Sequence, residues 1–565
     1  MNAWMAESLN EILINESARF SMQTKHSNNY LYEEFVQRLN KKTLLCWQSY
    51  QYNQIKFERI HRYCRKHGFI FDSSTVNTIQ KTLSTIINFA FNDQIKRNDD
   101  RKNIQLQLTH VHALPSRTEQ GLFLIIELGN PLEDVRFSLV VLLGKNVPAY
   151  EIVHSRGYNL PEQIRHSHGL TLLEHLAFDL KEFLEQVHAF IHLPHSLLLG
   201  LLLHFPLHQN ELNHVQILSW SDRFNCPDLL EHDFIVLLQQ SLERHVLKHH
   251  IQILACIEGH VAALISVAFE YPNTFLSLTF KDQFQLAFVE DTEILRSKNR
   301  LRAHYRTILS LDFQYLHSNK SIQSHALFQT LLTSIDTSLM HQFKVNYFDI
   351  FTSDRCLLEI IRLLILQLCR DEELFHESQW SKSKFNQSGS FDVKFLSCLL
   401  QRKYSALKPY LNELGLQGMK KIDLIYMEYI CHLILRRSTQ ILSCLIVCFA
   451  ERYNQENVTI AIESDLYRRC PIYQVYLHRE IEYLCKRWIT MFHFVYPSNK
   501  SYVGLTKKER IRWIELLFFQ LGLAAVMGLQ KTQKSMMDDI SRVYAQKSQR
   551  RRRRKERFLS NQMNT

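Results

Sequence analysis

The sequence predicts an α/β protein built as two lobes. Two strand-like runs, at 122–128 and 137–143, are joined by the turn G-N-P at 129–131. An amphipathic helix is indicated at 168–192, where leucine, phenylalanine and valine recur at spacings of three, four and seven. Strands that come first and then alternate with helices through long crossovers are typical of this class. At 565 residues the chain is long enough for two large cores.

The first hundred residues give a weaker signal. Residues 1–55 are polar and aromatic without a clear period, and they are assigned to an N-terminal extension. From 55 to 91 the pattern is helical, and residues 92–103 form a polar break. The candidate inward positions of this helix are Ile55, Ile60, Phe69, Ile79, Leu83, Ile87 and Phe91.

Beyond the amphipathic helix the chain alternates between strands and helices. Further strand-like runs occur at 197–205, 251–257 and 275–280. Residues 381–389 are polar and are expected to form a loop. After them the pattern is mostly helical, with one strand expected at 458–462.

Apolar runs and cysteines indicate a protein of a reducing compartment. Residues 1–15 lack the long apolar core behind a basic start that marks a secretory signal. The longest apolar stretches, 197–203 and 516–529, are too short to span a bilayer. Twelve cysteines without a CxxC pair fit reduced thiols. We therefore expect the cytoplasm, or the nucleus, and no membrane.

Positive charge is concentrated at the C-terminal end. Residues 547–557 contain eight Lys or Arg and one Glu, within a chain whose net charge is +11. The body is therefore not expected to bind nucleic acid. The tail, residues 531–565, is expected to be disordered. Its basic run either contacts an anionic partner or an import receptor, or is a solvated end.

Glycine is scarce in this chain. It accounts for 14 of 565 residues, whereas roughly 7% is usual. Enzymes that bind nucleotide phosphates need glycine where the backbone approaches a phosphate or turns with positive φ. The composition therefore disfavours nucleotide chemistry.

Histidines and cysteines at metal-ligand spacing are present without further partners. His188 and His192 lie four apart on the expected helix, and so do Cys444 and Cys448. In a chain with 28 histidines such pairs are expected by chance, and the spacing also describes one face of a helix. No metal site is predicted. G-x-S-x-G, H-E-x-x-H and G-x-x-x-x-G-K-[ST] are all missing from the sequence.

Several segments follow the motifs of one family in order. Residues 118–129 have the sequence T-E-Q-G-L-F-L-I-I-E-L-G, similar to T-E-x-G followed by F-L-A-L-D-L-G-G-T-N. Residues 193–206 correspond to L-P-x-G-F-T-F-S-F-P, and residues 218–224 (L-S-W-S-D-R-F) to L-x-W-T-K-x-F. The segment 256–291 follows, without a gap, V-V-N-D-T-V-G-T through G-T-G-T-N-A-C-Y-M-E.

The matches continue to about residue 505. Glu359 and Arg362 fit an E-L-V-R helix, residues 389–397 fit G-x-F-x-T-K-x-x-S, and residues 459–471 fit T-V-G-V-D-G-S-L-Y-x-x-x-P. In this order and spacing, the chain resembles a strongly diverged member of the eukaryotic ATP-dependent hexokinase and glucokinase family. The resemblance implies the two-lobed, actin-like ATPase fold, with a five-stranded mixed sheet and flanking helices in each lobe. It assigns residues 56–255 to the small lobe with a lead-in helix, and residues 256–530 to the large lobe.

The resemblance places the family's catalytic base at Gly259. In hexokinases the aspartate of the N-D-T block takes the proton of the sugar hydroxyl. Here that block is E-G-H at 258–260, and glycine has no side chain. Because neighbours on a strand point to opposite faces, neither Glu258 nor His260 is expected to take over the role. No catalytic residue is expected to be intact.

Most sugar-binding positions implied by the resemblance are also changed. One carboxylate, Glu290, is retained in place. The altered positions align with the family's serine of F-S-F-P, its T-K pair, its asparagine beside the base and, in a loose alignment, its carboxylate of N-x-E-W. They are, in that order, His204, Ser221, Asp222, Glu258 and Asp312.

The phosphate-binding loops depart furthest from the family. The first, G-G-T-N, is G-N-P-L at 129–132, and its proline removes an N–H donor. The second, G-T-G-T, is K-D-Q-F at 281–284 and carries an acidic side chain toward the phosphates. The adenosine-side G-A-G is I-V-C at 446–448, and the later D-G-S is E-S-D at 463–465. The altered cofactor-binding positions are Gly129, Asn130, Lys281, Asp282, Gln283 and Phe284.

These observations predict a hexokinase-like pseudoenzyme. It is expected to lack ATP:hexose phosphotransferase activity, to bind no cofactor and to act through protein contacts. Two alternatives stay open: an active hexokinase that uses Mg-ATP, and a sugar sensor that binds hexose without turnover.

Overall fold

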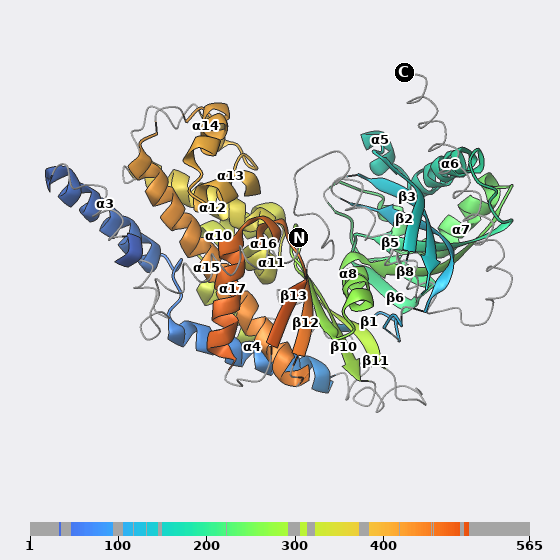
Figure 1. The fold of residues 1–565 in the computed structure, drawn as a ribbon, viewed down its shortest axis with the longest axis horizontal. Helices are drawn as coiled ribbons and strands as arrows, with labels where there is room; N and C mark the ends of the chain where they lie inside the picture. The colour runs from blue at the N-terminus through green and yellow to red at the C-terminus, as the bar shows by residue number, and fades with distance from the viewer. Residues whose placement is uncertain are drawn as a thin grey trace, which may run out of the picture.

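Two β-sheets organise the part of the chain that the structure, a computed structural model, describes. One sheet lies in each of two lobes (Figure 1). The structure describes residues 33–35, 47–93, 105–112, 114–116, 118–130, 133–144, 150–221, 223–291, 306–312, 323–371, 383–416, 419–453, 455, 457–485 and 491–495. The expectations for residues 1–32, for Tyr496 onward and for the basic tail fall outside these ranges.

The small lobe contains a five-stranded sheet, as the resemblance implies. Its order is β4-β3-β2-β5-β8, and β2, β5 and β8 run parallel. The four predicted strands are confirmed, whereas the polar sequence of β4 does not predict a strand. The strands are β2 (Gln120–Leu128), β3 (Val135–Leu143), β4 (Tyr150–Tyr158), β5 (Ser196–Leu203) and β8 (His250–Glu258).

The C-terminal ends of the three parallel strands meet at one edge of this sheet. Leu128 pairs with Leu203, which pairs with Glu258. In parallel sheets flanked by helices, ligands bind outside this edge. Two helices, α6 (Gly169–His188) and α7 (Phe234–His245), pack on one face and bury the predicted apolar stripe.

The large lobe contains a six-stranded sheet, one strand more than expected. Its order is β1-β11-β10-β9-β12-β13. The two edge strands lie far apart in the sequence, one before the small lobe and one near the end of the described residues. The strands are β1 (Gln105–Leu108), β9 (Thr274–Thr279), β10 (Gln285–Asp291), β11 (Arg306–Asp312), β12 (Asn457–Glu463) and β13 (Met491–Val495).

The assignment of the lead-in segment to the small lobe is wrong. Residues 47–93 form two helices, α3 (Trp47–Lys66) and α4 (Ser73–Asp93), that pack into the core of the large lobe. The single helix expected at 55–91 is broken at Gly68, whose φ of 79° ends the first helix. The chain then enters the small lobe after β1 and leaves it after β8.

One long helix, α15 (Lys421–Tyr453), runs through the large lobe. Among the described helices it alone has the length and apolar composition to cross a membrane, but 94% of its apolar window is buried inside the protein. It is therefore a core helix. Cys444 and Cys448 share its face toward α4, and their Sγ atoms lie 3.6 Å from the carbonyl oxygens of Val76 and Gln80.

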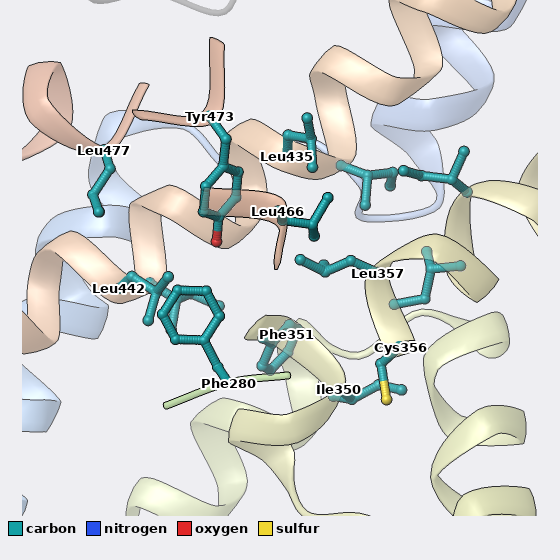
Figure 2. Packing of buried hydrophobic residues seen from close by; sticks show 14 of the residues in the cluster. Phe280, Ile350, Phe351, Cys356, Leu357, Leu435, Leu442, Leu466, Tyr473 and Leu477 are labelled. Atoms are coloured by element: carbon teal, nitrogen blue, oxygen red, sulfur yellow. The ribbon is translucent and has the colours of Figure 1, made fainter. Parts of the chain in front are cut away.

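The core of the large lobe extends to the loops that the family uses for phosphate. Phe280, at the end of β9, points into it beside Tyr473, Leu466 and Phe351 (Figure 2). All four side chains are buried. Buried apolar side chains therefore lie directly beneath these loops.

The remaining elements complete the two lobes. Near the small sheet lie α5 (Glu162–Arg165), β6 (Leu207–Glu211), β7 (His214–Ile217) and the 3₁₀ turn η1 (Pro227–Leu229). The large lobe adds α8 (Gly259–Glu270), α9 (Gln323–Leu331), α10 (Ser334–Phe343), α11 (Tyr347–Thr352), α12 (Asp354–Arg370), η3 (Lys384–Asn386), α13 (Val393–Leu400), α14 (Tyr404–Glu413), α16 (Asp465–Arg469) and α17 (Pro471–Leu484).

Candidate functional site

The family's base position lies where a strand becomes a helix. Strand β8 ends at Glu258, which is the N-cap of α8, and Gly259 is the first residue of that helix. The expectation that residues 258–260 alternate along one strand is therefore wrong. A Cβ built on Gly259 would lie 3.0 Å from Nδ1 and 3.2 Å from Cε1 of His204. The imidazole of His204 thus takes up the space beside the missing side chain.

His204 is held by a buried carboxylate. Its Nε2 lies 2.8 Å from Oε1 of Glu127, at the end of β2, and the Asn130 amide donates to the same oxygen at 2.7 Å. Glu127 is 1% exposed. Burial alone would raise the pKa of Glu127, but the hydrogen bonds from His204 and Asn130 and the nearby Arg136 hold it below its usual value. Glu127 is therefore ionised at neutral pH and accepts both hydrogen bonds.

Glu258 and His260 form a second polar cluster with Ser310 of β11. Oε1 of Glu258 accepts from the backbone N–H of Leu207 at 2.6 Å, and its Oε2 lies 3.2 Å from Nε2 of His260. The same His260 nitrogen lies 2.7 Å from Oγ of Ser310. Complete burial lowers the pKa of His260 to about 3, so this ring is neutral. Both side chains are thus bound to the protein itself.

One small cavity lies between the two lobes. Pro206 and Glu258 line it from the small lobe, and Gln285 and Ser310 line it from the large lobe. Its volume is about 30 Å³, and one water needs about 10–15 Å³ of such space. In this arrangement of the lobes the cavity holds about two water molecules and has no room for a hexose.

The second phosphate-loop segment is paired within the protein. Nζ of Lys281 lies 2.6 Å from Oε1 of Glu463, so residues from two altered loops neutralise each other. Phe284 is 5% exposed and stacks on Phe348, with ring centroids 5.2 Å apart. Asp282 and Gln283 are exposed. The segment has no glycine and is anchored at its two ends, by Lys281 and Phe284.

The turn at 463–465 is held by another internal carboxylate. Asp354 accepts from Oγ of Ser464 at 2.7 Å and from the N–H groups of Asp465 and Leu466 at 2.5 and 3.2 Å. Burial raises the pKa of Asp354 well above its usual range. The side chain of Asp354 thus accepts hydrogen bonds from the backbone N–H groups at the start of α16.

The first phosphate-loop segment is described only in part. Gly129 has φ of 87°, and a Cβ on it would lie 2.6 Å from Cζ of Phe205, so close packing on that ring requires glycine here. Pro131 and Leu132 lie outside the described residues, as does Asp222. Ser221 is half-buried.

The structure does not bring Glu290 to the cleft. Gln285 begins β10 at the cleft, and Glu290 lies five residues further along, where its Oε2 accepts from Nε of Arg452 at 2.9 Å. Glu290 and Arg452 line a separate cavity of about 100 Å³ together with Phe288 and Phe449. Gln285, which directly follows the second phosphate-loop segment, is a cleft residue that the sequence motifs do not indicate.

The other predicted positions add little to the cleft. The backbone of Asp312 pairs with that of Gln105 at the end of β11. Residues 446–448 are buried within α15. Within the described ranges, no three His, Cys, Asp or Glu side chains group as a metal site.

Sequence comparison decides the family. Two family models, each described as Hexokinase, match residues 65–269 and 319–504 of this chain. The chain belongs to the hexokinase family. Its identity to known hexokinases is low: 22% over 393 residues for that of Brugia malayi, covering 68% of this chain and 66% of the relative.

Other relatives give the same result. The hexokinase of Schistosoma mansoni is 22% identical over 412 residues, covering 72% of this chain and 85% of the relative. Hexokinase-1 of Rattus norvegicus is 21% identical over 436 residues, covering 75% of this chain. The match spans 45% of the rat protein's length.

Solved structures confirm the two-lobed hexokinase fold. The structure of Schistosoma mansoni hexokinase complexed with glucose superposes with a TM-score of 0.66 at 19% identity, covering 84% of this chain and 99% of that one. A second hexokinase crystal structure gives 0.63 at 17% identity, covering 83% and 99%. The resemblance seen in the motifs is therefore confirmed for family and fold.

We predict that Gly259→Asp will destabilise the protein by about 1–3 kcal/mol, because its Cβ overpacks against His204. The same change in a His204→Ser background should cost less, since the smaller side chain leaves room. Urea denaturation of the four proteins measures the coupling, with Gly259→Ala as a control that adds Cβ alone. An equal cost in both backgrounds would show that the two positions do not share this space.

Proposed function

We propose that this hexokinase-family protein does not phosphorylate hexoses with ATP and acts instead through protein contacts. The observation that carries the proposal is the ion pair between Lys281 and Glu463. Both residues belong to segments that bind phosphate in the family, and here they bind each other. Phosphates approaching this turn would compete with Glu463 for the Lys281 ammonium group.

The residues present do not fit the phosphates of Mg-ATP. Phosphoryl transfer depends on positioning and on electrostatic stabilisation of the phosphates by backbone N–H groups and magnesium. Phe284 is packed into the core, and Asp282 brings a negative charge to the same turn. The carboxyl group of Asp354 accepts hydrogen bonds from the backbone N–H groups of Asp465 and Leu466. Backbone donors and positive charge that a phosphate would need are therefore already engaged in these two turns.

The part of the cleft that holds the sugar hydroxyl in the family supports the same proposal. Gly259 has no carboxylate, and Glu258 and His260 are engaged by Leu207, Ser310 and each other. Hexose would have to open the cleft and replace these contacts.

A non-catalytic hexose sensor is the second candidate. It is favoured by the polar side chains that still line the small cavity, among them Glu258, His260, Gln285 and Ser310. Such a sensor would have to open its lobes to admit the sugar. Glucose-dependent thermal stabilisation without turnover would select this candidate.

The proposed protein contacts include the basic run at 547–557, which carries eight Lys or Arg. Such a run suits an acidic protein surface or an import receptor. We accordingly propose a cytoplasmic protein with access to the nucleus.

The purified full chain should not transfer phosphate from Mg-ATP to glucose, fructose or mannose. The reason is that both the base and the phosphate contacts are replaced. Formation of sugar phosphate should be followed by mass spectrometry, with Schistosoma mansoni hexokinase as the positive control. Turnover within a hundredfold of that control, after removal of contaminating kinase, would contradict the proposal.

Removing residues 547–565 should redistribute a fluorescent fusion in cells and reduce co-purification of its partners, without changing the melting temperature. The basic run, not the folded body, would then carry the contact. A charge-neutral variant with Gln at the eight basic positions is the matched control, and it should behave like the deletion. Unchanged distribution and unchanged partners would instead identify a solvated end.

A further inference from the structure

The cavity at the end of β10 remote from the cleft has both charged and aromatic walls. Phe288 and Glu290 lie two apart on β10 and therefore point to the same side of the strand. Phe449, Arg452 and Tyr453 lie three and four apart near the end of α15, so they share one face of the helix. Strand and helix thus bring an ion pair and several rings to one space of about 100 Å³.

The guanidinium group of Arg452 is fixed on two sides. Its Nε donates to Oε2 of Glu290 at 2.9 Å, and the group lies over the ring of Phe91, 3.5 Å from the ring centroid. Among the described residues, no group accepts a hydrogen bond from its two terminal nitrogens. The side chain is 24% exposed, so it is open to solvent. A guanidinium held in this way offers its terminal N–H groups as a fork that matches a carboxylate.

Glu290 supplies the complementary half of the site. Arg452 uses its Oε2, whereas its Oε1 accepts no hydrogen bond from the part of the chain that the structure describes. An ionised carboxylate only accepts hydrogen bonds, so a ligand at Oε1 must carry a donor. The rings of Phe288 and Tyr453 line the same cavity, and the faces of aromatic rings attract cations. The cavity is therefore complementary to a molecule that has both a carboxylate and a positive group.

The net charge of the cavity favours the same kind of molecule. Glu290 and Arg452 neutralise each other. A ligand with a single charge would add an uncompensated charge to a largely enclosed space, which is costly. A ligand with one charge of each sign adds none, because each of its groups meets the opposite charge of the ion pair.

The volume limits the size of this molecule. A cavity of about 150 Å³ takes benzene, so one of about 100 Å³ takes a molecule of about four or five heavy atoms. We propose that this cavity binds a small zwitterion, a free α-amino acid of the size of glycine. Its carboxylate accepts hydrogen bonds from the terminal N–H groups of Arg452, and its ammonium group donates to Oε1 of Glu290. The site lies apart from the cleft, and the proposal does not depend on the proposed function.

Saturation-transfer difference NMR on the full chain tests the class of ligand, because it detects weak binding to an unlabelled protein. Glycine should give a signal that saturates with concentration. Sodium acetate and methylammonium chloride each carry one of its two charges, and at equal ionic strength they should bind roughly tenfold more weakly or worse. L-Leucine has the same two charges on a larger molecule and should not compete with glycine.

Two substitutions separate the halves of the site. Arg452→Gln removes the fork and keeps a polar side chain, and Glu290→Gln removes the negative charge at nearly constant volume. Each should weaken glycine binding by roughly tenfold or more, because a hydrogen bond to a charged group is lost. Arg156→Gln, at the exposed ion pair with Glu182, is the matched control and should leave glycine binding unchanged. Melting temperatures establish that each variant is folded.

The comparison of ligands needs no variant, so the proposal can fail on the wild-type protein alone. It is overturned if glycine gives no saturable signal, if acetate or methylammonium binds as well as glycine, or if L-leucine competes. Unchanged glycine binding in a folded Arg452→Gln protein would also overturn it. In each of these cases the ion pair serves packing between β10 and α15 alone.

Discussion

Polar groups buried between the two lobes must be paired, and this constraint shapes the cleft. A buried donor or acceptor without a partner costs about 1–3 kcal/mol. When the ligand-binding residues of a hexokinase are exchanged, the groups left behind need new partners from the chain. Glu127 binds His204, and Lys281 binds Glu463. Glu258 binds the Leu207 N–H. These groups are therefore engaged by contacts within each lobe.

The fold survives these exchanges because its stability comes from other residues. Phe280 and Tyr473 lie in the core directly beneath the altered loops (Figure 2). Burying a large apolar side chain stabilises by roughly 1.5–3 kcal/mol, and none of these side chains needs a ligand. Loop residues can thus change while the core is kept. This separation explains how the chain matches hexokinase structures over 84% of its length at 19% identity.

The sequence predicts the buried parts of this protein better than its polar ones. Strands β2 and β5 are predictable because their residues are apolar on both faces, whereas β4, with Glu151 and Arg156, carries no such signal. Motif order identifies the family and the change at Gly259. It does not show that His204 fills the adjoining space, since residues far apart in sequence meet only through the fold. For the same reason, the motif alignment assigns Glu290 to the sugar site and does not indicate Gln285. An ungapped alignment does not show which end of a strand faces the cleft.

In the function we propose, the chain itself occupies the phosphate contacts of the family, and equilibrium binding of Mg-ATP tests this most directly. A ligand at 100 times its dissociation constant adds about 2.7 kcal/mol of stability. We predict no change in the melting temperature of the full chain up to millimolar Mg-ATP. A saturable rise that the non-hydrolysable analogue reproduces would contradict this, and would mean that the pairing of Lys281 with Glu463 yields to the nucleotide.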